Sequence, residues 1–201
     1  MKYSFLAFSV SLSVTFGAAT AAAQKGNASD VTGPPAITIA GGAFTPLPVP
    51  NSKGGSGTGG TSGASGGAAL HGVVASIGAT FSAGTAVISP ATGQAIAPAA
   101  VETVGALIVS GSMASANSVG SSLQRGGATP LSVGTLMEAM IALSNASPSS
   151  VPGAIANAGK AFNALVASAP AGFFRSNGGG PPATFLAIHA ALTPMLAAIG
   201  H

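Results

Sequence analysis

Three segments near the end of the chain decide its fold: PLSVGTLMEAMIALS (Pro130–Ser144), VPGAIANAGKAFNALVASA (Val151–Ala169) and PATFLAIHAALTPMLAAI (Pro182–Ile199). In the middle segment the apolar side chains recur at steps of three and four residues, which places them on one face of a helix. They are Val151, Ile155, Ala158, Phe162, Leu165, Val166 and Ala169. The other two segments have the same period. The sequence therefore predicts a helical hairpin with a third helix packed across it.

The residues that flank these segments agree with helix boundaries. Thr129 precedes Pro130, as a capping residue precedes a proline in the first helical turn, where the missing N–H costs nothing. Ser150 precedes the second segment in the same way, with Pro152 still inside the first turn. Pro170 directly follows the middle segment and predicts its end.

Residues 1–23 have the pattern of a secretory signal peptide. Lys2 supplies the positive charge, Phe5–Phe16 a moderately apolar stretch, and the small residues that end at Ala23 a cleavage site. A membrane anchor is the alternative, but the apolar run is shorter than the ~20 residues that a spanning helix needs. The sequence thus predicts a secreted, periplasmic or cell-surface protein.

Residues 24–69 are rich in glycine, serine and proline and predict a disordered tether. The run Lys53–Gly67 consists almost wholly of Gly, Ser and Thr, which bury too little apolar surface to offset the entropy of ordering. Within this tether, Ala36–Ile39 and Phe44 could dock as one short strand.

Residues 70–97 predict a small β element of about three strands, by the alternation and turn rules. Larger and smaller side chains alternate from Val73 to Phe81, the period of a half-buried strand. Two further apolar runs flank Pro90–Gly93, a plausible four-residue hairpin loop.

Residues 98–201 predict a helical domain, a bundle of three to four helices. Pro98–Arg125 carries start and stop signals of a helix, with glycines that favour a break near Gly111. Phe173 and Phe174 are expected to close the open end of the bundle rather than to bind a ligand. The predicted fold class is mainly α (α+β): a small β-hairpin element followed by this bundle.

The composition excludes several classes of function. Charged residues make up 4% of the chain, against ~25% in ordinary domains. The cations beyond the predicted signal peptide are scattered, whereas nucleic-acid binding needs a clustered basic surface. They are Lys25, Lys53, Arg125, Lys160 and Arg175. The absence of cysteine excludes disulfides, thiolate metal sites and a cysteine nucleophile.

Few groups are available for catalysis. Beyond the predicted signal peptide the titratable acids and histidines are Asp30, Glu102, Glu138, His71, His189 and His201. Gly63–Gly67 matches the nucleophile-elbow pattern and Gly55–Gly60 matches GxGxxG, but both lie in the predicted tether, without the strand and helix that each motif requires. The sequence therefore assigns no catalytic, cofactor-binding or metal-binding residue and predicts no cofactor.

These observations favour an exported, non-catalytic structural or interaction protein of the cell envelope or extracellular space. Its expected partners are further copies of itself or components of the envelope or matrix, and not nucleic acid. One alternative is a membrane-active or pore-associated protein that uses Val101–Ala116, whose small residues permit close helix approach in lipid. The second alternative is a secreted hydrolase in which a serine acts with His189 and Glu138.

Overall fold

The computed structural model describes residues 37–39, 42–44, 46–50, 62–175 and 180–199. The chain divides into two units, Met1–Asp30 and Val31–His201, and all of the described residues belong to the second. The predicted signal peptide, residues 1–23, lies outside the described residues.

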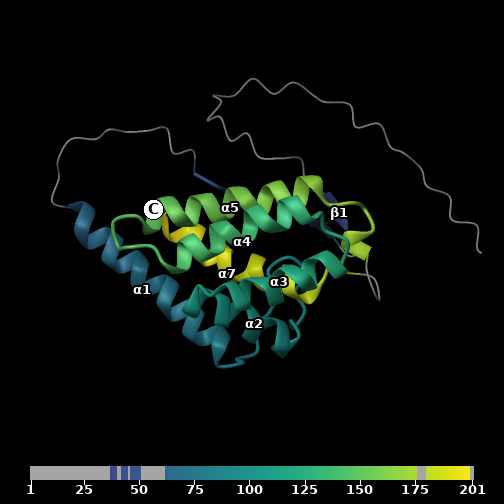
Figure 1. Ribbon diagram of the computed structural model, residues 1–201, viewed down its shortest axis with the longest axis horizontal. Helices are drawn as coiled ribbons and strands as arrows, with labels where there is room; N and C mark the ends of the chain where they lie inside the picture. Colours follow the sequence, from purple (N-terminus) through teal and green to yellow (C-terminus); the bar gives the residue numbers. More distant parts are fainter. Residues whose placement is uncertain (1–36, 40–41, 45, 51–61, 176–179, 200–201) are drawn as a thin grey trace, which may run out of the picture. The chain divides into compact units, whose positions relative to one another are not determined.

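The second unit is mostly helical, as the sequence predicts (Figure 1). Its elements in chain order are β1 (Ile37–Ile39), β2 (Gly42–Phe44), α1 (Ser62–Ser82), α2 (Pro98–Ser110), α3 (Met113–Arg125), α4 (Pro130–Ser144), α5 (Val151–Ser168), the short 3-10 helix η1 (Phe173–Arg175) and α7 (Ala183–Ile199).

The three helices predicted from residue 130 onward are α4, α5 and α7. Helices α4 and α5 form the expected hairpin and lie side by side in Figure 1, and α7 packs against α5. Thr129 has the extended backbone of a capping residue, but its hydroxyl bonds to the Ser132 hydroxyl (Oγ1–Oγ 2.7 Å) instead of to a backbone N–H. Proline lies in the first turn of both α4 and α5, and neither Thr129 nor Ser150 makes a side-chain capping hydrogen bond.

The β element predicted for residues 70–97 is wrong, because residues 62–82 form the helix α1. The large side chains of this stretch follow the helical period: Val74 and Phe81 are buried, and Leu70 and Ile77 are packed against the core. The apparent alternation depends on alanine, serine and threonine, whose small side chains are compatible with both the strand period and the helix period. Ala75, which lies at the same alternation position as Val73 and Ile77, is exposed.

Residues 85–97 form a turn rather than paired strands. The loop Pro90–Gly93 is closed by the Ser89 N–H, which donates to the Gln94 carbonyl at 2.8 Å. Beyond this loop, the two flanking segments pair at a single isolated β-bridge between Ile88 and Ala95. The predicted turn is therefore present at Pro90–Gly93, but its flanking segments do not form strands.

The only strands among the described residues are β1 and β2, which pair antiparallel with Ile37 opposite Phe44. They lie in the stretch predicted as a tether, residues 24–69, where one strand was considered. The same stretch contains the extended segment 46–50 and the first turns of α1, which begins at Ser62. The other tether residues lie outside the described part of the chain.

The break expected near Gly111 separates α2 from α3. Gly111 has a left-handed backbone (φ 55°), and the Ser112 hydroxyl accepts the Ser115 N–H to begin α3. The stretch Val101–Ala116 is therefore divided between two helices of 13 residues each. None of the described helices combines the length and the apolar character that crossing a bilayer requires.

An aromatic cluster joins α5, η1 and α7 within the core. The Phe162 ring of α5 stacks on Phe185 of α7 with 4.8 Å between centroids. Phe173 and Phe174 of η1 meet Phe185 edge-on at 5.3 and 5.8 Å, and both are buried. Their expected role of closing the bundle agrees with this burial.

Candidate functional site

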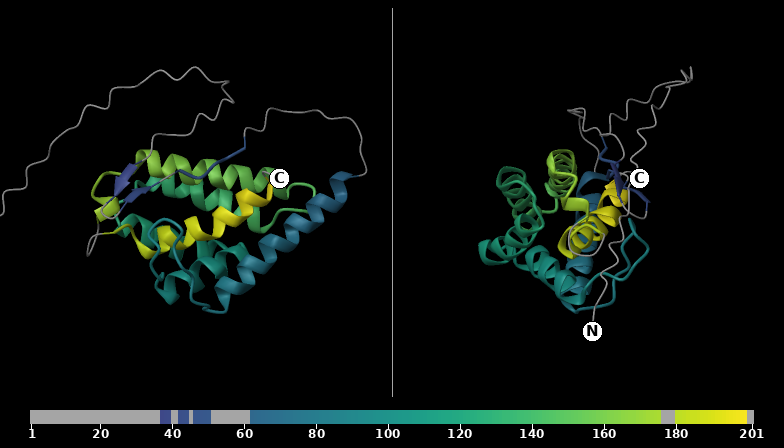
Figure 2. Two further views of the ribbon diagram at one scale, coloured as in Figure 1. Left: turned by 180° about the vertical axis from the view of Figure 1, so that it is seen from behind. Right: turned by 90° about the vertical axis from the view of Figure 1, so that its right-hand side faces the viewer.

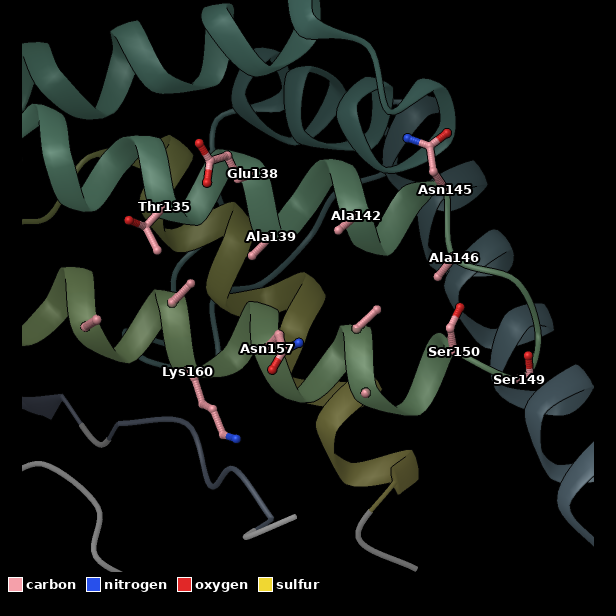
Figure 3. Close-up of a pocket in the computed structure, with 14 residues that line it drawn as sticks. Thr135, Glu138, Ala139, Ala142, Asn145, Ala146, Ser149, Ser150, Asn157 and Lys160 are labelled. Atoms are coloured by element: carbon pink, nitrogen blue, oxygen red, sulfur yellow. The ribbon is translucent and has the colours of Figure 1, made fainter. Parts of the chain in front are cut away.

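A groove runs between α4 and α5 on their solvent side, and we call it the α4–α5 groove (Figure 3). Most of the side chains that line it are alanine, serine, asparagine and glycine. The lining residues are Thr135, Glu138, Ala139, Ala142, Asn145, Ala146, Ser149, Ser150, Gly153, Ala154, Asn157, Lys160, Ala161 and Ala164.

The groove exists because the sequence places small side chains where two packed helices face solvent. The large side chains of the hairpin, such as Met140 and Ile155, point into the core and hold the helices together. The outer valley between packed helices, whose axes lie ~8–10 Å apart, is ordinarily covered by long side chains. Here Ala142 and Ala164 are exposed and offer only methyl groups, so the valley stays open.

The polar groups at the loop end of the groove are already held by hydrogen bonds. The Asn145 amide donates to the Ile141 carbonyl (Nδ2–O 2.9 Å), which leaves its own oxygen toward solvent. The Ser147 hydroxyl lies 3.1 Å from that of Ser149 and 3.0 Å from that of Ser150. These hydroxyls bond to each other and not to a base that would activate a nucleophile.

The groove carries one charge of each sign. Glu138 on α4 and Lys160 on α5 extend away from each other on opposite sides of it (Figure 3). Its formal charge is therefore zero, and the remaining surface offers hydroxyls, amides and methyl groups. Such a surface makes contacts that are apolar and hydrogen-bonded rather than ionic.

The residues considered for a hydrolase fall in different surroundings. Glu138 lines the groove, whereas His189 lies in α7, is 7% exposed and packs against the Phe162 ring, with 5.8 Å between ring centroids. His71 on α1 and Glu102 on α2 are exposed on separate helices. Asp30 and His201 lie outside the described residues. At the described positions, no three carboxylate or imidazole groups lie together as metal ligands would.

Burial lowers the pKa of His189 from 6.5 to about 4, because the charged imidazolium loses its water of solvation. The unfolded chain therefore takes up a proton at higher pH than the folded chain. We expect the free energy of unfolding to be fully retained above pH 6.5 and to fall as the pH drops toward 4. The loss should be on the order of 3 kcal/mol, measured by urea denaturation at a series of pH values.

Two variants separate this effect from other titrations. His189→Gln removes the buried imidazole and should flatten the profile between pH 6.5 and 4. Thr80→Ala changes an exposed, uncharged side chain of α1 and should leave the profile as it is. An equal flattening by both variants would show that burial of His189 is not the cause.

Sequence reasoning missed the α4–α5 groove. The prediction of these helices used their large apolar residues, which mark the buried faces. It included nothing about the opposite, exposed faces. A second period was present: Gly153, Asn157, Ala161 and Ala164 recur at steps of three and four residues and line one side of the groove. Small residues at that spacing, on a helix whose other face is apolar, were the available signal.

Comparison of the chain with protein-family models, with curated proteins and with solved structures gave no match, so no relative indicates its function.

Proposed function

We propose that the chain is an exported, non-catalytic interaction protein of the cell envelope or extracellular space, which associates with further copies of itself through the α4–α5 groove. The observation that carries the proposal is the groove itself, a long open valley lined by small side chains. Export is inferred from the sequence pattern of residues 1–23 alone.

The small residues favour a helix as the occupant. Where the valley offers only methyl groups, as at Ala142 and Ala164, the backbone of a second helix can approach closely and pack its ridge between α4 and α5. The chain has six Lys/Arg and three Asp/Glu in all. Copies of it therefore repel each other little, and a second copy is a suitable partner.

Sedimentation equilibrium over a concentration series tests this proposal. We expect the weight-average mass to rise with concentration, and the association to persist at about 1 M NaCl, where charges are screened within ~3 Å. Ala142→Arg fills the valley with a long charged side chain and should weaken self-association by about tenfold or more, equivalent to ~1.4 kcal/mol.

The matched control is Ala79→Arg, which adds the same side chain at an exposed position in the last turn of α1. This variant should associate as the unmodified chain does. A strict monomer at every concentration, together with hydrolytic turnover that is lost in His189→Ala, would replace the proposal with an enzyme.

A further inference from the structure

The segment Pro46–Pro50, of sequence PLPVP, lies extended against α5 and α7, and we call it the proline strap. It follows β2 in the chain and can be traced in Figure 2, in blue, past the helices of the bundle. Leu47 is 4% exposed and Val49 is partly buried, whereas Pro48 between them is exposed. Pro46 and Pro50 are also partly buried, so the strap packs on the bundle along its length, with Leu47 the most deeply buried.

One side chain of α5 holds the strap by its backbone. The Leu47 N–H donates to the Asn163 amide oxygen (N–Oδ1 3.0 Å), and the Asn163 amide donates back to the Leu47 carbonyl (Nδ2–O 2.8 Å). The neighbours Pro46 and Pro48 have no N–H. Asn163 therefore bonds the one residue of this triplet that can both donate and accept.

A glycine makes room for the second apolar side chain. A Cβ at Gly159 would lie 3.0 Å from Val49 Cγ2 and 3.0 Å from Leu196 Cδ1, tighter than ordinary van der Waals contact. A side chain at residue 159 would therefore push on both Val49 and Leu196, and the glycine leaves them room to pack. Together, Gly159, Asn163 and Leu196 form what we call the strap site.

The strap site combines core packing with a feature of peptide-binding sites: Leu47 belongs to the hydrophobic core, and its backbone is bound by a side chain of α5. The strap and Asn163 are 116 residues apart in sequence, and their backbone contact is a two-way amide clamp. Proline at alternate positions fixes the backbone before binding, which lowers the entropy lost on docking. Residues 51–61 link the strap to α1, so its binding in cis is favoured by a high effective concentration.

We propose that α5 and α7 carry a binding site for extended peptides with proline at alternate positions and apolar residues between them, which this chain fills with its own Pro46–Pro50. In this site Asn163 binds the peptide backbone, and the space above Gly159 accommodates an apolar side chain. This inference is independent of the proposed self-association, since it concerns another surface of α5 and other residues.

The test adds the strap sequence as a separate peptide to a chain whose own strap no longer binds. In the full-length chain, Leu47→Ser and Val49→Ser remove the apolar contacts of the strap, and we expect them to empty the strap site. An end-blocked, fluorescently labelled peptide of residues 45–50 (TPLPVP) is then titrated into this chain. We expect saturable binding by fluorescence anisotropy. If the strap fills its site about 90% of the time in the unmodified chain, the peptide should bind that chain about tenfold more weakly.

Asn163→Ala in the emptied chain supplies the specific control. It should weaken peptide binding by about tenfold or more, because both backbone hydrogen bonds are lost. Thr80→Ala, at an exposed position of α1 outside the α4–α5 groove, should leave binding unchanged. Equal peptide binding by all three emptied chains, or binding by none, would overturn the proposal.

A second measurement covers the case in which the emptied chain does not fold. In the unmodified chain the Asn163 side-chain amide resonance reports on the clamp, and an excess of unlabelled peptide should broaden or shift it through exchange. A peptide with serine in place of its leucine should have no effect. An unmoved Asn163 resonance at saturating peptide would contradict the proposal.

Discussion

Phe162→Ala should lower the free energy of unfolding by roughly 3–5 kcal/mol, the usual cost of emptying a buried aromatic site. The Phe162 side chain is fully buried, stacks on Phe185 and contacts the imidazole of His189. It also joins α5 to α7, so its removal leaves a cavity between two helices that few other large side chains can fill. Urea denaturation followed by circular dichroism measures the change.

Asn157→Ala is the matched control for this prediction. Asn157 is exposed and lies five residues before Phe162 on the same helix. Its replacement should change the free energy of unfolding by no more than about 0.5 kcal/mol. Losses of similar size in the two variants would mean that the buried face of α5 is misassigned.

Gly105→Ala should destabilise the fold by about 3 kcal/mol, the upper end of the usual cost of overpacking. A Cβ at Gly105 on α2 would meet the Ser82 nitrogen and would lie 2.6 Å from the Phe81 carbonyl carbon at the end of α1. These are backbone atoms, which cannot turn aside as the end of a side chain can. The two helices would have to separate, and α1 and α2 have the most extensive contact of any pair of elements.

Gly134→Ala tests the same chemical change where there is space. A Cβ at Gly134 on α4 meets nothing within 4 Å, and the position is exposed inside a helix. Alanine there should raise the free energy of unfolding by roughly 0.5–1 kcal/mol, because glycine is the poorer helix former. The two substitutions thus have opposite expected signs, and a shared sign in melting or urea denaturation would contradict this packing of α1 against α2.

The helices that could be predicted are those whose large side chains outnumber their small ones on the buried face. In α5, Ile155, Phe162 and Leu165 define the period without ambiguity, and prolines define where the helices begin. In α1 the buried face depends on Val74 and Phe81 among many small residues, so a strand period fitted equally well. The local pattern alone does not distinguish a helix from a strand in this stretch, whereas the packing of α1 against α2 favours the helix.

The candidate sites were harder to predict, because both depend on contacts distant in sequence. The clamp joins Leu47 to Asn163, and no local pattern marks an asparagine at that position as a partner of a proline-rich segment. The α4–α5 groove is open because the exposed faces of α4 and α5 have few large side chains. His189, which the hydrolase alternative pairs with a serine and Glu138, is buried in α7, and this burial lowers its pKa to about 4.

Thiol accessibility tests most directly whether the α4–α5 groove is an association surface. The chain has no cysteine, so Ala142→Cys and Ala79→Cys each introduce a single thiol, the first in the groove and the second at an exposed position of α1. We predict that modification of the thiol in the Ala142→Cys chain slows as protein concentration rises, while that in the Ala79→Cys chain keeps a constant rate. Equal, concentration-independent rates in both chains would contradict association through the groove.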